Sequence, residues 1–292
     1  MNERIVTFGL RNELVGILTT PDSALDLQRP IVLCWNVGVN HRVGPFRFNV
    51  DLARHLAAQG FATFRFDKSG MGDSDFRRQA VPEAESEALD VTEAMDIVTR
   101  RTSAEQFVLV GYCSSVDAAH QVTMVDPRVV GAVHIEGYAY ATPGSRRRAR
   151  RTLLSWSRWD LAIRRRIIWI LRRRSSSSKS DAGGSVYSRR IPTQEQFAAD
   201  LATLSSELAK PHLLIYSGSL NGPEQFSEMF DHPGIDHSRI VFEYYADADH
   251  TFYTVEHRET MVRSVAEWLA NAFPRDVHRF GDCQMNGGTG LA

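Results

Sequence analysis

The stretch FVLVGYCSSVDAA, residues 107–119, places a cysteine where a reactive side chain could be used. An apolar run enters a turn of small residues and leaves through an alanine-containing helical pattern, which is typical of a strand–turn–helix nucleophile elbow. Gly111 and Ser115 flank Cys113 and are small enough to let strand and helix approach. A helix start and a nearby imidazole would favour the thiolate. The pattern predicts that Cys113 is a nucleophile.

Two other interpretations of this stretch stay open. Cysteine is among the most buried residue types, so Cys113 could be a structural core residue in a similar turn. Ser114 or Ser115 could be the nucleophile only in a shifted frame, which loses the small flanking residues.

For the base we expect His250, one of ten histidines, because it follows the last apparent strand in ADADHTF and could take the thiol proton. The alternative is a surface histidine in a polar loop.

These side chains need a scaffold, and the rest of the chain predicts one. The chain has 292 residues, 43% of them hydrophobic and 24% charged, enough for one large domain or a domain with an insertion. Apolar runs that alternate with amphipathic helical patterns favour a mostly parallel sheet covered by helices on both faces. We expect an opening hairpin over 4–21, strands at 30–38, 61–67, 106–111, 129–137, 211–218 and 239–250, and helices at 46–60, 83–101 and 260–273.

The cysteines and the first residues bear on the cellular setting. Cys34, Cys113 and Cys283 form no metal-ligand or CxxC spacing, so we expect free thiols and no metal, disulfide or cofactor. The opening MNERIVTFGL carries charges of both signs and lacks a long apolar core, which argues against a secretory signal or a membrane span. The sequence therefore predicts a cytoplasmic protein.

Residues 145–174 differ from the rest of the chain. They contain twelve arginines and one aspartate, a local charge of +11 in a chain of net charge −1, so the remainder carries −12. Tryptophans and isoleucines recur at three or four residues, and arginines recur every seven on another face, at Arg151, Arg158, Arg165 and Arg172. This predicts an amphipathic basic helix or helix pair. We interpret residues 141–192 as a helical cap with a mobile serine-rich linker, inserted between core parts 1–140 and 193–275, with 276–292 as a disordered tail.

In order and spacing, NVGVNHRVGP, FRFDKSGMGDSD, GYCSS and ADADHTF resemble the α/β-hydrolase fold. More narrowly, they are similar to its serine-aminopeptidase-like branch with a helical cap, and to bacterial exosortase-associated hydrolases, whose elbow commonly contains a cysteine. The resemblance covers residues 4–273. It implies His250 as the catalytic base. Two departures stand out, since Ser115 replaces the usual second glycine and Asn221 stands where an aspartate is expected.

The resemblance leaves the third catalytic residue open between Asn221 and Glu224. A serine nucleophile needs a carboxylate beside the histidine, but a cysteine–histidine pair can rest as an ion pair that asparagine merely orients. On this view the departures at Cys113 and Asn221 belong together. The alternatives are Glu224 as the acid, no third member, and Asn221 as a turn residue before Gly222.

The same resemblance predicts an oxyanion hole. Its donors should be the backbone N–H of Ser114 and one from the loop after residues 30–36, at Val37 or Gly38. His41 in that loop either lines the substrate pocket or fixes the loop. Asp67 is expected to tie loops together by hydrogen bonds.

A cysteine–histidine pair beside an oxyanion hole predicts cleavage of an ester or thioester through an acyl-enzyme. The alternatives are an acyltransferase that uses an amine, alcohol or thiol, and a non-catalytic member that binds a partner through the cap. The arginine face is either solvated or docks an acidic acyl carrier protein or the phosphates of a coenzyme A thioester. Membrane contact is possible but not favoured. Nucleic acid is not expected, because no recognition motif accompanies the arginines.

Overall fold

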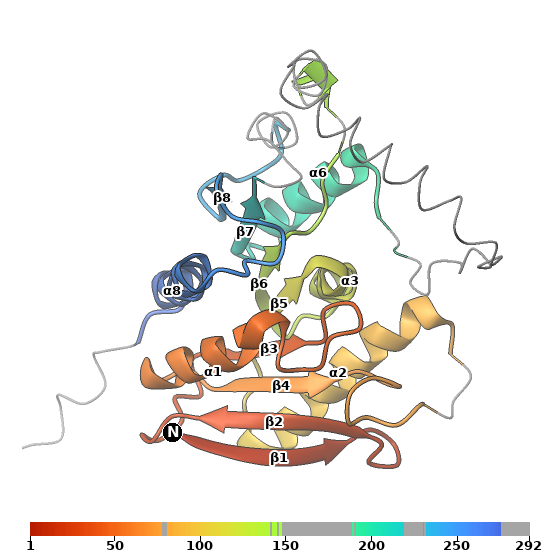
Figure 1. The fold of residues 1–292 in the computed structure, drawn as a ribbon, viewed down its shortest axis with the longest axis vertical. Helices are drawn as coiled ribbons and strands as arrows, with labels where there is room; N and C mark the ends of the chain where they lie inside the picture. The colour runs from red at the N-terminus through yellow and green to blue at the C-terminus, as the bar shows by residue number, and fades with distance from the viewer. Residues whose placement is uncertain are drawn as a thin grey trace, which may run out of the picture.

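The computed structural model describes residues 1–77, 81–140, 142–144, 146–147, 189, 191–218, 230 and 232–275. Among these residues eight strands form one sheet in the order β1-β2-β4-β3-β5-β6-β7-β8, which runs upward in Figure 1 from β1. The strands are β1 (Asn2–Phe8), β2 (Leu14–Thr20), β3 (Ile31–Trp35), β4 (Thr63–Asp67), β5 (Phe107–Tyr112), β6 (Val129–Ile135), β7 (His212–Ser217) and β8 (Ile240–Tyr245). β1 and β2 form an antiparallel hairpin, β2 pairs antiparallel with β4, and all further pairs are parallel.

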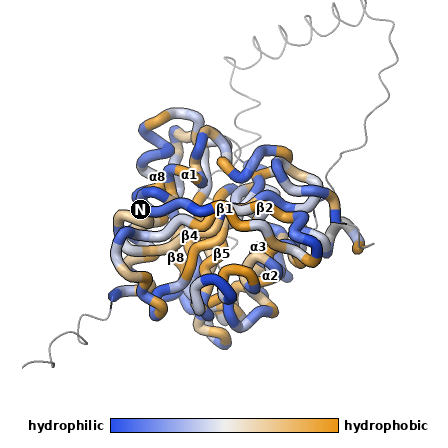
Figure 2. The backbone as a smooth tube through the Cα atoms, turned by 90° about the horizontal axis from the view of Figure 1, so that it is seen from below, coloured by the Kyte–Doolittle hydropathy of each residue, from blue (hydrophilic) through white to orange (hydrophobic). Residues whose placement is uncertain are grey.

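Helices cover both faces of this sheet. On one face α1 (Phe48–Ala58) and α8 (Val255–Ala272) share a core with β3, β5, β6 and β7. On the other face lie α2 (Glu83–Thr102), α3 (Val116–Val125) and α6 (Gln194–Ala202), whose buried side chains form two further clusters. The hydropathy colouring of Figure 2 shows hydrophobic strands inside, whereas the edge strand β1 begins with hydrophilic residues at the N-terminus.

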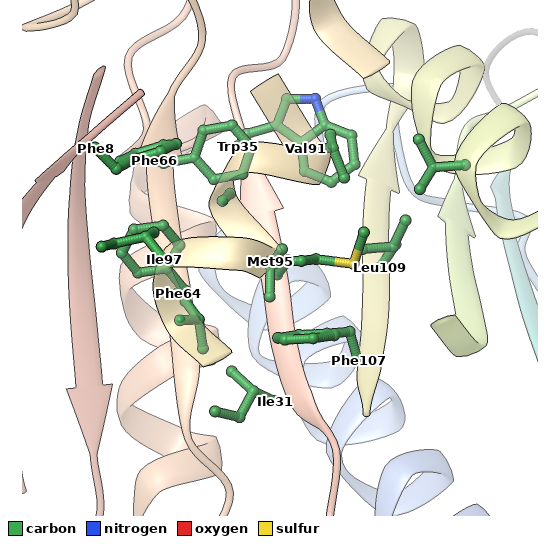
Figure 3. Packing of buried hydrophobic residues seen from close by; sticks show 14 of the residues in the cluster. Phe8, Ile31, Trp35, Phe64, Phe66, Val91, Met95, Ile97, Phe107 and Leu109 are labelled. Carbon is green, nitrogen blue, oxygen red and sulfur yellow. The ribbon is translucent and has the colours of Figure 1, made fainter. Parts of the chain in front are cut away.

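The α2 face shows how the apolar pattern of the sequence becomes packing. The rings of Trp35 and Phe66 stack with centroids 5.7 Å apart, and Met95 of α2 points toward Leu109 of β5 (Figure 3). The indole N–H of Trp35 donates to Glu87 of α2 at 2.7 Å, so the one polar atom of this ring is paired. Burial on this scale fixes β3, β4 and β5 relative to one another.

Parallel pairing brings the carboxyl ends of β3, β5, β6, β7 and β8 to the same edge of the sheet, which is where open α/β sheets place their ligands. The loops that follow these strands contain Gly38, Cys113, Glu136 and His250. Residues that are far apart in the chain are thereby gathered at one place.

The expected architecture is confirmed, including the opening hairpin, the stop of α1 before Gly60 and the final helix. Most of residues 141–192, which we interpret as a cap, lie outside the described residues. All four arginines of the predicted basic face lie outside them as well, namely Arg151, Arg158, Arg165 and Arg172. The domain boundaries stay predictions. None of the described helices combines the length and apolar character needed to cross a membrane.

Candidate active site

Cys113 lies at the sharp turn between β5 and α3, as the first residue of the short 3-10 helix Cys113–Ser115. Its φ of 53° is in the left-handed region that non-glycine residues rarely adopt. The turn depends on Gly111, because a Cβ there would come within 2.8 Å of the Val116 backbone and 2.9 Å of Ala119. This geometry matches a nucleophile elbow and turns the Cys113 side chain out of the strand.

The hydrogen bonds of Ser115 explain why a serine replaces the usual glycine at this position. Its hydroxyl accepts the Tyr112 N–H at 2.7 Å and donates to the Tyr112 carbonyl at 2.9 Å. A glycine would leave both backbone groups without this partner. Ser115 is buried and hydrogen-bonded to the strand end, so it stabilises the turn and is not positioned as a nucleophile.

The Cys113 thiol is half-buried and forms a hydrogen bond with His250. Burial alone would raise the pKa of Cys113. It is outweighed by the hydrogen bond and charge of His250, by the charge of Arg189 and by the Ser114 N–H, so the pKa is lowered. The hydrogen bonds to Cys113 and then to Glu136 raise the pKa of His250 to about 10, against desolvation. The two shifts together favour a resting thiolate–imidazolium pair.

The carboxylate beside His250 belongs to Glu136, a residue that the sequence pattern did not single out. Its Oε2 lies 2.8 Å from Nδ1 of His250, and its side chain is 1% exposed. Oε1 accepts the Ser217 N–H in a short hydrogen bond, and the Glu136 N–H donates to the Ile215 carbonyl at 2.8 Å. The carboxylate is thus fixed to β7 while it faces the imidazole. Its φ of 51° places it in a second left-handed turn.

This geometry bears on the expectation that the histidine has no carboxylate beside it. The histidine does not lack a carboxylate, because Glu136 from the end of β6 occupies its Nδ1 side. Cys113 and Asn221 therefore do not need to be read as a coupled pair. Asn221 and Glu224 both lie outside the described residues. The signal that could have identified Glu136 was an acidic residue directly after a buried strand that neighbours the strand leading to Cys113.

A tyrosine holds the histidine from its other side. The Tyr112 hydroxyl donates to the His250 backbone carbonyl at 2.9 Å, and the Tyr112 ring packs edge-on against Phe48 with centroids 5.8 Å apart. Since Tyr112 immediately precedes Cys113, the elbow and the histidine loop are joined at two points. The Asp249 carboxylate accepts hydrogen bonds from the N–H and hydroxyl of Thr251 and from the N–H of Tyr253.

The residues expected to form the oxyanion hole lie beside Cys113, and one of them makes an unexpected contact. The Ser114 N–H reaches the sulfur of Cys113, and the loop after β3 lies alongside. In that loop the N–H of Gly38 donates to the Ser114 hydroxyl oxygen at 2.8 Å. Gly38 has a φ of 56°, and no atom lies within 4 Å of where its Cβ would be. Val37 is buried, and its side chain belongs to the core that α1 and α8 cover.

His41 lies with Asp67 and Asp73, in an arrangement that could hold a metal ion. The guanidinium of Arg42 already lies among these atoms. Its NH1 is 2.8 Å from Nε2 of His41 and 2.7 Å from Asp73, and it also pairs closely with Asp67. Asp67 further accepts the side-chain amide of Asn36 at 2.7 Å. The guanidinium of Arg42 therefore occupies the position that a metal ion would take, and the cluster links the loops after β3 and β4.

Arg189 adds a positive charge near Cys113. It donates from Nε and NH2 to Asp117 of α3, at 3.2 and 2.7 Å, and lies over the Tyr138 ring at 5.8 Å. Asp117 is one helical turn beyond Cys113, and Tyr138 is two residues beyond Glu136. Arg189 is therefore held between the two segments that carry Cys113 and Glu136.

Comparison with known proteins agrees with this architecture. No family model and no curated relative matches the chain. Among solved structures it is similar to the esterase domain of a Rhodothermus marinus protein (17% identity, 93% and 99% of the two chains, TM-score 0.55). It is also similar to the α/β hydrolase GrgF of Penicillium sp. sh18 (16%, 94% and 99%, 0.56) and to the thioesterase domain of the curacin biosynthetic pathway (18%, 92% and 99%, 0.51). The chain has the α/β-hydrolase fold.

Proposed function

We propose that this protein cleaves an ester or thioester through an acyl-enzyme on Cys113, with His250 as the acid–base residue and Glu136 as its carboxylate partner. The observation that carries the proposal is the continuous contact from Cys113 to His250 to Glu136, at the edge of the sheet where loops from five parallel strands meet. The thiolate is favoured at rest, as covalent catalysis by cysteine requires.

The reaction follows from this geometry. The Cys113 thiolate attacks the acyl carbon, and the carbonyl oxygen becomes an oxyanion that donors near Ser114 stabilise. As the C–O or C–S bond breaks, His250 gives its proton to the leaving alcohol or thiol. Glu136 keeps Nδ1 oriented throughout. His250 then takes a proton from water, whose oxygen attacks the thioester, and the carboxylic acid and Cys113 are released.

The cysteine itself favours a second candidate, acyl transfer. An acyl-cysteine is a thioester, which amines and thiols attack more readily than water. The same first step then ends on a different acceptor. An acidic carrier protein or a coenzyme A thioester, held by the arginines of residues 145–174, remains our proposal for the donor. It is supported by the +11 charge of that segment alone.

The test is the intact mass of the protein after brief incubation with short and long acyl thioesters. We expect a gain of one acyl group on wild type, and peptide mapping should place it on Cys113. Cys34→Ala is the matched control, because Cys34 is buried and burial raises the pKa of its thiol to about 12. Acylation that persists in Cys113→Ala would contradict the mechanism. Decay of the adduct with and without added amine separates hydrolysis from transfer.

A further inference from the structure

The contact between Gly38 and Ser114 changes which atoms can stabilise the oxyanion. In the arrangement that the fold suggests, the backbone N–H after β3 would point at the substrate oxygen together with the Ser114 N–H. Here the Gly38 N–H already donates to the Ser114 hydroxyl oxygen at 2.8 Å. The second backbone donor is therefore occupied by a side chain of the elbow.

That hydroxyl still has a proton to donate. Ser114 is 5% exposed, and within the described part of the chain its hydroxyl proton has no acceptor. A hydroxyl that accepts a hydrogen bond becomes a better donor, because neighbouring hydrogen bonds polarise one another. Ser114 directly follows Cys113, and its own N–H reaches the sulfur. The hydroxyl therefore contacts the loop after β3 and belongs to the residue whose N–H reaches the Cys113 sulfur.

We propose that the Ser114 hydroxyl is a catalytic oxyanion donor, which takes the place of the Gly38 N–H and is polarised by it. Resting on the function proposed above, this assigns two donors to one residue, its backbone N–H and its Oγ–H. Only a hydrogen bond strengthens as the carbonyl oxygen gains charge, so no proton is transferred at this step. The competing explanation is that the hydroxyl merely links the two loops and blocks a donor.

The two explanations predict opposite results for Ser114→Ala. If the hydroxyl is the donor, its loss should lower kcat, since removal of one oxyanion donor costs about 100-fold to 1,000-fold. We expect about 10-fold to 100-fold, because the freed Gly38 N–H can partly replace it. If the hydroxyl only blocks Gly38, the variant should be as active as wild type or more active. KM should change little in either case.

A chemical control separates the oxyanion from the nucleophile. Alkylation of Cys113 by iodoacetamide is a displacement at saturated carbon and forms no oxyanion. Ser114→Ala should keep an alkylation rate within about 2-fold of wild type, which shows that fold, Cys113 and His250 are intact. Ser114→Thr keeps a hydroxyl and should recover part of the lost kcat.

A second measurement does not depend on turnover. An alkyl trifluoromethyl ketone adds to the thiolate and gives a stable oxyanion, so its affinity reports the oxyanion donors directly. We expect Ser114→Ala to weaken this affinity by about the factor lost in kcat, with alkylation unchanged. Unchanged or tighter ketone binding in Ser114→Ala would overturn the proposal. If wild type binds the ketone but hydrolyses no acyl donor, the proposed function fails while the ketone comparison still decides the role of Ser114. Absence of ketone binding in wild type overturns both.

Discussion

Glu136 and His250 are 114 positions apart in the chain, yet Oε2 of the glutamate lies 2.8 Å from Nδ1 of the histidine. Glu136 directly follows β6, which lies next to β5, the strand that leads to Cys113, and the Glu136 side chain is almost completely buried. A buried carboxylate with two distinct partners, the His250 imidazole and the Ser217 N–H, is fixed in position.

We expect Glu136→Gln to lower kcat/KM by about 10-fold to 100-fold, or about 1.4 to 2.7 kcal/mol. The amide retains an oxygen for Nδ1 but no charge to favour the imidazolium. Asp249→Asn is the matched control, since Asp249 neighbours His250 in sequence but contacts Thr251 and Tyr253. It should cost less than about 3-fold. Equal losses in the two variants would show that Glu136 is not the acid. Kinetics with a soluble thioester measure both.

Cys113→Ser should keep activity well above that of Cys113→Ala, because Glu136 supplies the carboxylate that a serine nucleophile needs. The effects of Cys113→Ser and Glu136→Gln on activity should also be non-additive. A serine rests neutral, so the imidazolium charge develops only during reaction, whereas the cysteine pair is already charged. Glu136→Gln should therefore cost more in the Cys113→Ser background than in wild type, which a double-mutant cycle measures. Additive losses would argue that the thiolate and imidazolium are not paired at rest.

Arg189→Gln should raise the pKa of the Cys113 thiol. Burial already pushes this pKa upward, and the charge of Arg189 is one of the contributions that lower it. The rate of iodoacetamide alkylation against pH should shift its acid limb to higher pH. Arg239→Gln removes an arginine that pairs with the exposed Asp236 and should leave the profile unchanged. A profile that Arg189→Gln does not move would mean that Arg189 only tethers its segment to α3.

Stability should fall below neutral pH because of histidines outside the active site. His134 and His212 lie edge to face with ring centroids 5.8 Å apart, and both ring nitrogens of His134 lack a hydrogen-bond partner among the described residues. Desolvation lowers the pKa of His134 far below its ordinary value, and it lowers that of His212 to about 4. Between pH 6.5 and 4 the unfolded chain binds more protons than the folded one, so the free energy of unfolding decreases as pH falls, by about 1.4 kcal/mol per pH unit and group.

Urea unfolding at pH 7.5 and pH 5 measures this effect. His250 also takes up a proton in the unfolded chain near its ordinary pKa of about 6.5, so the contribution of the buried histidines is taken from the difference between a variant and wild type. His134→Leu removes two unpaired buried nitrogens and should reduce the loss on acidification, with a gain of about 1 kcal/mol at neutral pH. An unchanged pH dependence in this variant would contradict the assignment.

The sequence predicted the scaffold better than the site. Local pattern alone identifies the helix over 83–101 and the strand over 106–111. It also identifies the elbow at Cys113. The pairing of Glu136 with His250 depends on which strands become neighbours, and two positive φ angles decide where the side chains point. Neither is encoded in local spacing. The resemblance directed attention to the loop after β7, whereas the contact comes from β6.

Cys113 and Glu136 both occupy left-handed backbone, at φ of 53° and 51°, which costs a non-glycine residue roughly 1 kcal/mol each. The strained backbone of these two residues thus lies at the candidate active site. A Cys113→Gly protein should be catalytically dead yet harder to unfold than Cys113→Ala, because glycine adopts this conformation freely. A glycine at the elbow would remove this conformational cost, so the side chain of Cys113 lowers the stability of the fold, and the reactivity proposed above gives that loss a reason.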